Sequence, residues 1–206
     1  MIAIIDYGMG NVRSIINALQ FIGCEVVITS DFKEIDAASH IILPGVGAFG
    51  DAMNNIVRCG LDEILENQVL KKGKPFLGIC LGLQLLAKTS EEHGLHKGLG
   101  YFDAEVKKFK FDKIKLHVPH IGWNDVCPQK NHFIFRKLNQ DENIFYFVHS
   151  YHIVCNQEQD ILATCDYGIS FIAAIARDNI VATQFHPEKS QDNGIQILKN
   201  FVKWNP

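Results

Sequence analysis

A cysteine between two glycines is the first segment whose residue types suit acyl-transfer chemistry. In Gly78-Ile79-Cys80-Leu81-Gly82 the cysteine falls where a buried strand is expected to pass into a helix. The flanking glycines permit the sharp turn that presents a nucleophile at the end of a strand, and a helix N-terminus favours a thiolate over a thiol. The Leu81 N–H would then face a developing oxyanion. A small cysteine packed in the core between glycines matches the same residues, so the motif alone leaves both interpretations open.

A histidine and a carboxylate two residues apart supply the other groups that a thiol hydrolase needs. His186-Pro187-Glu188 follows an apolar run, residues 180–185, that is typical of a strand. In an extended chain residues i and i+2 point to the same side, so His186 and Glu188 are expected to share a face. A base oriented by a carboxylate is the usual partner of an activated nucleophile. We therefore predict a triad of Cys80, His186 and Glu188 at the C-terminal edge of a sheet.

A glycine-rich loop can complete such a site. Pro44-Gly45-Val46-Gly47 follows a predicted strand at residues 40–43. Its glycines allow the N–H groups of Val46 and Gly47 to turn inward as oxyanion donors. An ordinary loop between a strand and a helix has the same composition.

These segments need a parallel sheet to bring them together. Strands are expected at residues 1–6, 25–29, 40–43 and 75–79, and helices at residues 11–21, 51–58, 61–72 and 81–88. Strands that alternate with helices predict right-handed crossovers and a parallel sheet covered by helices on both faces.

The second half of the chain predicts mostly strands. They are expected at residues 104–109, 115–118, 145–149, 161–165, 171–176 and 180–185, before a last helix at 192–203. Arg177-Asp178-Asn179 suits a short hairpin, and Gly122-Trp123-Asn124 is expected in an irregular segment. The prediction is an α/β fold with a mostly parallel central sheet flanked by helices and with added antiparallel strands in the second half, in a single domain over residues 1–206.

Composition excludes several classes of protein. Of the 206 residues, 47% are hydrophobic and 21% are charged, as in globular proteins. A formal net charge of −3 argues against a nucleic-acid binder, whose surface would be basic. Apolar runs such as residues 171–176 are too short to cross a bilayer, and the first six residues do not resemble a secretory signal. We expect a cytoplasmic protein with no membrane association.

No metal or cofactor is expected. The six cysteines form no C-x-x-C motif, and no carboxylate or cysteine cluster accompanies the histidine pairs spaced by three, at residues 93 and 96, 117 and 120, and 149 and 152. Residues three apart lie on opposite sides of a strand. Gly8-Met9-Gly10 lacks the third glycine of a dinucleotide-binding motif.

Taken together, the motifs resemble the class I, or triad, glutamine amidotransferases. The resemblance rests on residues 43–47, 78–84 and 184–190. Within that family the chain is similar to the glutaminase subunits of imidazole glycerol phosphate synthase, on residues 6–11, 119–124 and 147–151. The matching segments run in order through nearly the whole chain.

The resemblance implies a reaction and roles for further residues. Cys80 attacks the side-chain amide of glutamine, His186 protonates the departing ammonia and then activates water, and Glu188 orients His186. Gln84, Ser150 and Tyr151 are implied to hold the α-amino and α-carboxylate groups of glutamine.

The same resemblance implies a partner. It is a (β/α)8 cyclase subunit in a heterodimer, where ammonia is used to form imidazole glycerol phosphate and AICAR in histidine biosynthesis. The residues that match positions near this partner are Asn11, Trp123, Asn124 and Lys189.

Three other functions remain open from the sequence. The same glutaminase could feed ammonia to a cyclase-like partner that amidinates a bacterial surface sugar. A non-catalytic scaffold could have kept the fold, although Cys80, His186 and Glu188 together argue against it. The third open function is that of a different cysteine hydrolase built on the same sheet.

Overall fold

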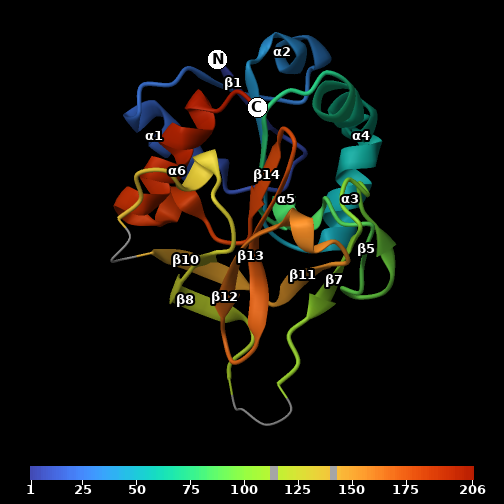
Figure 1. Cartoon of the computed structure of the whole chain (residues 1–206). Coiled ribbons are helices and arrows are strands. Elements are labelled where there is room, and N and C mark those ends of the chain that lie inside the picture. Colours follow the sequence, from blue (N-terminus) through green and yellow to red (C-terminus); the bar gives the residue numbers. More distant parts are fainter. Residues whose placement is uncertain (112–115, 140–142) are drawn as a thin grey trace.

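An eight-stranded sheet forms the centre of the molecule in the computed structural model, which describes residues 1–111, 116–139 and 143–206 (Figure 1). Five neighbouring strands are parallel: β2 (Val26–Thr29), β1 (Ile2–Ile5), β3 (His40–Gly45), β4 (Phe76–Cys80) and β14 (Ile180–Thr183). The sheet continues with antiparallel β13 (Ser170–Arg177), β12 (Ile161–Asp166) and β9 (Cys127–Pro128). The predicted α/β fold with added antiparallel strands is confirmed.

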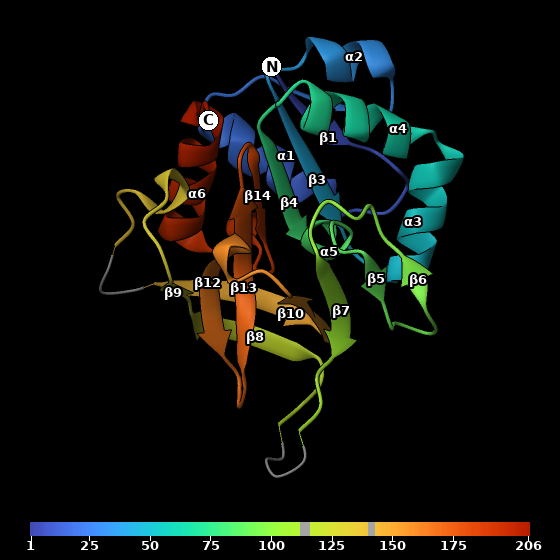
Figure 2. The same cartoon turned by 45° about the vertical axis from the view of Figure 1, so that its right-hand side comes forward.

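Helices cover both faces of this sheet (Figure 2). One face carries α1 (Val12–Phe21) and α6 (Gln191–Lys203), and the other carries α2 (Phe32–Ala37), α3 (Phe49–Arg58) and α4 (Leu61–Leu65), which continues as a π-helix over Glu66–Lys71. Successive strand residues point to opposite faces. Ile4 therefore packs with the α1 side and Ile5 with the α3 side, so each face has its own apolar core.

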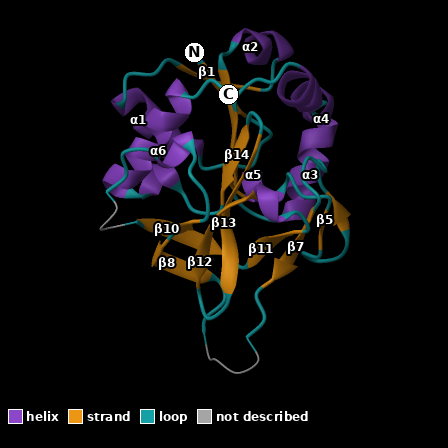
Figure 3. Cartoon of the chain, in the orientation of Figure 1, coloured by secondary structure: helices purple, strands orange, loops and turns teal. Residues whose placement is uncertain are grey.

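Two smaller sheets lie next to the carboxyl ends of the parallel strands (Figure 3). One pairs β8 (His120–Asp125) with β10 (Ile144–His149), and the other has the order β11-β7-β5-β6. Its strands are β11 (Tyr151–Cys155), β7 (Ala104–Lys108), β5 (Thr89–Ser90) and β6 (His96–Lys97). Three-residue 3₁₀ turns follow at Phe133–Phe135 (η2), Glu158–Asp160 (η4) and Pro187–Lys189 (η5). Within the described residues, no helix has the length and apolar character to cross a membrane.

The helix expected at residues 81–88 is wrong in length, because α5 (Leu81–Gln84) ends after one turn. The carbonyl groups of residues 85–88 accept hydrogen bonds from N–H groups of residues 98–102. The helix itself ends because the Leu86 and Ala87 N–H groups bond to carbonyls only three residues back and the Lys88 N–H donates to the Ala104 carbonyl of β7, so the chain enters β5 instead.

The strand expected at residues 115–118 is also wrong. Lys115 lies outside the described residues, residues 116–118 are in no strand, and β8 begins directly after Pro119, which has no N–H for a ladder. Gly122-Trp123-Asn124 was expected to be irregular, but it lies inside β8 and pairs residue for residue with β10. Gly122 has a φ of 142°, so the ladder passes through a backbone conformation that favours glycine.

Candidate active site

Cys80 occupies the turn between β4 and α5. Its backbone has φ 55° and ψ −109°, a conformation that residues with a side chain rarely adopt, and its side chain is 7% exposed. The neighbouring backbones approach so closely that a Cβ atom on Gly82 would lie 1.9 Å from the Leu43 carbonyl oxygen. The glycines of the motif thus permit the close contact of β3, β4 and α5 that forms the elbow.

His186 and Glu188 form a buried pair beside this elbow. Nδ1 of His186 lies 2.8 Å from Oε1 of Glu188, with the two side chains 4% and 2% exposed. The extended geometry expected for residues 186–188 is wrong, because η5 is a 3₁₀ turn. The turn still brings the two side chains together, and the His186 N–H donates to the Tyr146 carbonyl at 2.9 Å.

The protonation of His186 reflects this environment. Burial lowers the pKa of His186, but the nearby Cys80 sulfur and the Glu188 carboxylate raise it, and the result is a pKa of about 10. Nε2 of His186 is buried and forms no conventional hydrogen bond with the described residues. A charged imidazolium held by Glu188 and close to a sulfur atom can serve as an acid toward a leaving group.

The loop after β3 borders the nucleophile. Gly45 and Cys80 are opposite each other in the β3–β4 ladder, and the Tyr7 hydroxyl donates to the Pro44 carbonyl at 2.8 Å. Val46 is 41% exposed, and Gly47 has a φ of 100°. The loop is therefore held by a hydrogen bond at Pro44 and is more exposed at Val46, next to Cys80.

These segments enclose a pocket of about 290 Å³. The structure brings together there all but one of the residues predicted for catalysis, the oxyanion and the substrate: Val46, Gly47, Cys80, Leu81, Gln84, Ser150, Tyr151 and His186. The exception, Glu188, reaches the pocket through His186. Gln84 is buried, and its Nε2 donates to the Tyr151 carbonyl at 2.9 Å and to Gln184 Oε1 at 3.0 Å.

Four further residues line the pocket without having been predicted, namely Glu92, Pro119, Val148 and His149. Glu92 brings a carboxylate, whose Oε2 accepts a hydrogen bond from the Phe49 N–H at 2.7 Å. In the sequence Glu91 and Glu92 look like a solvated pair of charges, so no local signal marks Glu92.

The residues predicted to lie near a partner fall into separate groups. Trp123 is 46% exposed, and its ring centroid lies 5.7 Å from that of Tyr146. Lys189 Nζ lies 5.6 Å from the same Tyr146 ring. Asn124 turns the other way and donates to His120 Nε2 and to the Asp166 carbonyl. Asn11 is exposed at the start of α1, and its side chain does not cap the helix.

Two histidines from different pairs of the spacing-by-three set, His120 and His149, meet across the β8–β10 ladder. Nδ1 of His120 lies 3.1 Å from Nε2 of His149. Burial lowers the pKa of His120 to about 4 and that of His149 to about 3, so both are neutral at pH 7. In the part of the chain that the structure describes, no group of three or more His, Cys, Asp or Glu side chains is arranged to hold a metal ion.

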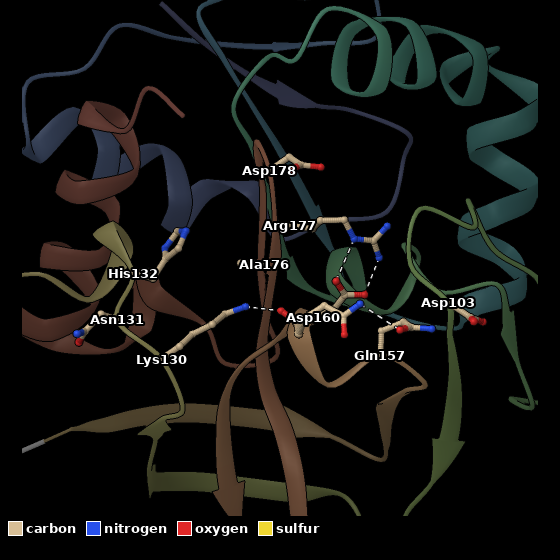
Figure 4. A pocket seen from close by; sticks show the side chains of 10 residues that line it. Asp103, Lys130, Asn131, His132, Gln157, Asp160, Ala176, Arg177 and Asp178 are labelled. Atoms are coloured by element: carbon tan, nitrogen blue, oxygen red, sulfur yellow. Dashed lines mark hydrogen bonds and ion pairs between the residues drawn. The ribbon is translucent and has the colours of Figure 1, made fainter.

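A larger pocket, of about 690 Å³, lies beside η4 and the end of β13 (Figure 4). Several of its charged groups are already paired. Arg177 donates to both carboxylate oxygens of Asp160 at 2.9 and 2.6 Å, and Lys130 donates to the Gln159 carbonyl. None of the predicted site residues lines it. The smaller pocket at Cys80 is therefore the candidate active site.

The fold and this pocket define a class: an α/β protein with a cysteine at a strand-to-helix elbow and a buried histidine–carboxylate pair beside it. The family model for class I glutamine amidotransferases matches residues 3–204. The imidazole glycerol phosphate synthase subunit HisH 2 of Nitrobacter winogradskyi is 51% identical, with 100% of this chain and 99% of the relative covered. The subunit HisH of Acinetobacter baylyi is 48% identical, with 99% and 98% covered.

A solved structure shows the same fold at lower similarity. PurLQS from Thermotoga maritima superposes with a TM-score of 0.73 at 18% identity, covering 98% of this chain and 97% of the other. The chain belongs to the class I glutamine amidotransferase family. It is a glutaminase-type enzyme of that family.

Proposed function

We propose that this enzyme hydrolyses glutamine to glutamate and ammonia with Cys80 as the nucleophile. The observation that carries the proposal is His186, which is held by Glu188 and lies close enough to the Cys80 sulfur for that sulfur to raise its pKa. The thiolate attacks the amide carbon, and the N–H groups of Leu81 and of the Val46–Gly47 segment stabilise the oxyanion.

Both halves of the reaction use the same imidazole. His186 gives its proton to the departing ammonia as the tetrahedral intermediate collapses to a γ-glutamyl thioester. His186 then takes a proton from water as the water oxygen attacks the thioester carbon. The carbon–sulfur bond breaks, glutamate leaves, and the electron pair returns to Cys80 as a thiolate.

The polar groups of the pocket suit the α-amino and α-carboxylate groups of glutamine. Both hydrogens of Gln84 Nε2 already have acceptors, so Gln84 presents only its Oε1 to a substrate. An oxygen acceptor and the Glu92 carboxylate fit an α-ammonium group. The Ser150–Tyr151 segment is then the side of the pocket for the α-carboxylate.

The proposed acceptor of ammonia is a (β/α)8 cyclase subunit in a cytoplasmic heterodimer, with imidazole glycerol phosphate and AICAR as products in histidine biosynthesis. The names of the full-length relatives support this pathway. Exposed apolar side chains also support a protein partner on this side of the molecule, since Val46 borders the pocket and Ile121 and Trp123 are 59% and 46% exposed on β8.

One alternative keeps the glutaminase and changes the acceptor to a cyclase-like protein that amidinates a surface sugar. The name of the Nitrobacter winogradskyi relative carries the numeral 2. For this chain, a second copy of the subunit in the same genome or a neighbouring sugar-synthesis gene would favour this alternative.

Glutamate release from glutamine tests both proposals. The chain is assayed alone, with the histidine-pathway cyclase of the same genome and its nucleotide ligand, and with a cyclase-like protein encoded near sugar-synthesis genes. Strong stimulation by the first partner, lost in Cys80→Ala, is the expected result. Stimulation by the second partner alone would move the enzyme to the sugar pathway. No turnover with any partner would contradict the glutaminase and favour a scaffold, whereas turnover of other amides but not of glutamine would indicate a different cysteine hydrolase.

A further inference from the structure

A buried chain of hydrogen bonds connects the pocket wall with the Cys80 sulfur. It begins at the Tyr151 carbonyl, which accepts from Gln84 Nε2 at 2.9 Å and contacts His149 Nδ1 at 2.8 Å. A carbonyl oxygen can only accept. Both nitrogens that face it must therefore carry hydrogens, which sets the tautomer of His149 and the orientation of the Gln84 amide.

The orientation of Gln84 determines that of Gln184. The second hydrogen of Gln84 Nε2 meets Oε1 of Gln184 at 3.0 Å. The carbonyl end of Gln184 is thereby turned toward Gln84, and its Nε2 lies 3.7 Å from the Cys80 sulfur. Gln184 is fully buried and Gln84 is 5% exposed. Turning the Gln184 amide would set two buried N–H groups against each other. Turning the Gln84 amide would set its oxygen against the Tyr151 carbonyl and the Gln184 oxygen. A buried polar group left without its partner costs free energy.

The Cys80 sulfur consequently has two contacts that respond in opposite ways to its ionisation. The thiol hydrogen can be donated to the Val148 carbonyl, 3.9 Å from the sulfur, and this contact exists only while the thiol keeps its proton. The N–H of Gln184 points at the sulfur in either state, and its bond becomes stronger when the sulfur is negative.

We propose that Gln184 is a catalytic residue that stabilises the Cys80 thiolate by donating a hydrogen bond to it. The bond acts when His186 holds the thiol proton and again when the thioester breaks and the electron pair returns to sulfur. This inference rests on the proposed glutaminase function. It adds to the triad a donor that comes from the residue directly after β14.

Other ionisable groups lie around the Cys80 sulfur, and a test of Gln184 must leave these residues unchanged. They are His186 with Glu188, the neutral His149, Glu92 in the pocket, and Tyr7, whose pKa is raised by burial and by the Cys80 charge. Substituting Gln184 leaves all of them in place. A difference between the variant and the wild type therefore reports on the Gln184 donor.

The test is the rate of Cys80 alkylation by iodoacetamide as a function of pH, followed by mass spectrometry of the Cys80 peptide because the chain has six cysteines. Gln184→Met keeps the size of the side chain and removes the donor. We expect its alkylation rate at pH 7 to fall about tenfold and its profile to move to higher pH. Gln184→Glu keeps an acceptor for Gln84 and turns an oxygen toward the sulfur. It should shift the pH profile of alkylation further toward higher pH than Gln184→Met does.

Gln68→Met is the matched control, because Gln68 is also fully buried and its amide bonds to Asp36, away from Cys80. Its profile should equal that of the wild type. A wild-type profile in folded Gln184→Met would overturn the proposal, as would equal shifts in both methionine variants. If Gln184→Met does not fold, the ¹⁵N-labelled wild type decides: the Gln184 side-chain amide resonance must move as Cys80 ionises, and an unmoved resonance overturns the proposal.

The assay contains no glutamine, so its failure is distinct from failure of the proposed function. Stimulated glutamine turnover with an unshifted Gln184→Met profile overturns only the role of Gln184. A shifted profile in a chain that never hydrolyses glutamine overturns the glutaminase proposal and leaves Gln184 as the thiolate donor.

Discussion

Nδ1 of His186 lies 2.8 Å from Oε1 of Glu188, and this ion pair is almost completely buried. The pair belongs to a 3₁₀ turn whose first residue, Pro187, has a restricted backbone. The turn sets the direction of the imidazole. Because Nδ1 is engaged, only Nε2 remains for chemistry at the Cys80 sulfur.

Replacing Glu188 by glutamine should lower activity while Cys80 stays in place. Loss of the carboxylate removes one of the two groups that raise the pKa of His186, and the imidazolium that protonates ammonia becomes less stable. We expect the partner-stimulated kcat to fall about a hundredfold or more. Steady-state assays of glutamate release measure this, with the exposed Glu25→Gln as the control. Equal rates in the two variants would contradict an orienting role for Glu188.

Acid should destabilise the protein through its buried histidines. The pKa of His149 is about 3 when folded and near 6.5 when unfolded, so between these values the unfolded chain binds the proton. Stability is therefore lost as the pH falls below about 6.5. From pH 6.5 to 4.5 His149 alone should cost about 2–3 kcal/mol of unfolding free energy.

Urea denaturation across that pH range checks this expectation. His149→Gln removes the titrating ring and should flatten the dependence of the unfolding free energy on pH. A slope as steep as that of the wild type would show that other groups cause the acid sensitivity.

The loop after β3 should be essential for turnover but not for thiol reactivity. Gly47→Pro removes one oxyanion N–H and cannot adopt the φ of 100° that Gly47 has. We expect partner-stimulated turnover to be abolished, while Cys80 is still alkylated by iodoacetamide. If this variant shows the stimulated rate of the wild type, the oxyanion role proposed for the Val46–Gly47 segment is wrong.

The elbow should tolerate no side chain at position 82. In Gly82→Ala the new Cβ would lie 1.9 Å from the Leu43 carbonyl oxygen, so β3 or α5 would have to move. A loss of about 3 kcal/mol in unfolding free energy is expected. Gly10→Ala is the control, because its Cβ would meet nothing closer than 3.4 Å. Thermal or urea unfolding of both variants makes the comparison, and equal stability would refute the close approach.

Structural features formed by residues close together in the chain were largely predictable from the sequence. The glycines around Cys80, the alternation of strands and helices, and the histidine two residues before a carboxylate are local patterns, and local backbone geometry responds to them directly. That is why the elbow, the parallel strands and the approach of His186 to Glu188 were expected. Even there, the 3₁₀ turn at residues 187–189 differs from the extended chain that was predicted.

Contacts between distant residues depended on the order of the strands. Glu92 enters the pocket after the chain leaves α5, where the Lys88 N–H donates to the Ala104 carbonyl and β5 pairs with β7. His120 meets His149 because β8 and β10 pair in one register. The bond between Gln84 and Gln184 joins residues 100 positions apart.

The chemistry of the nucleophile could therefore be predicted from short motifs, because local sterics determine the conformation of a turn and of its flanking residues. The direction of each hydrogen bond around that nucleophile depends instead on which carbonyl the folded chain places opposite each amide, and only the packed structure supplies those partners.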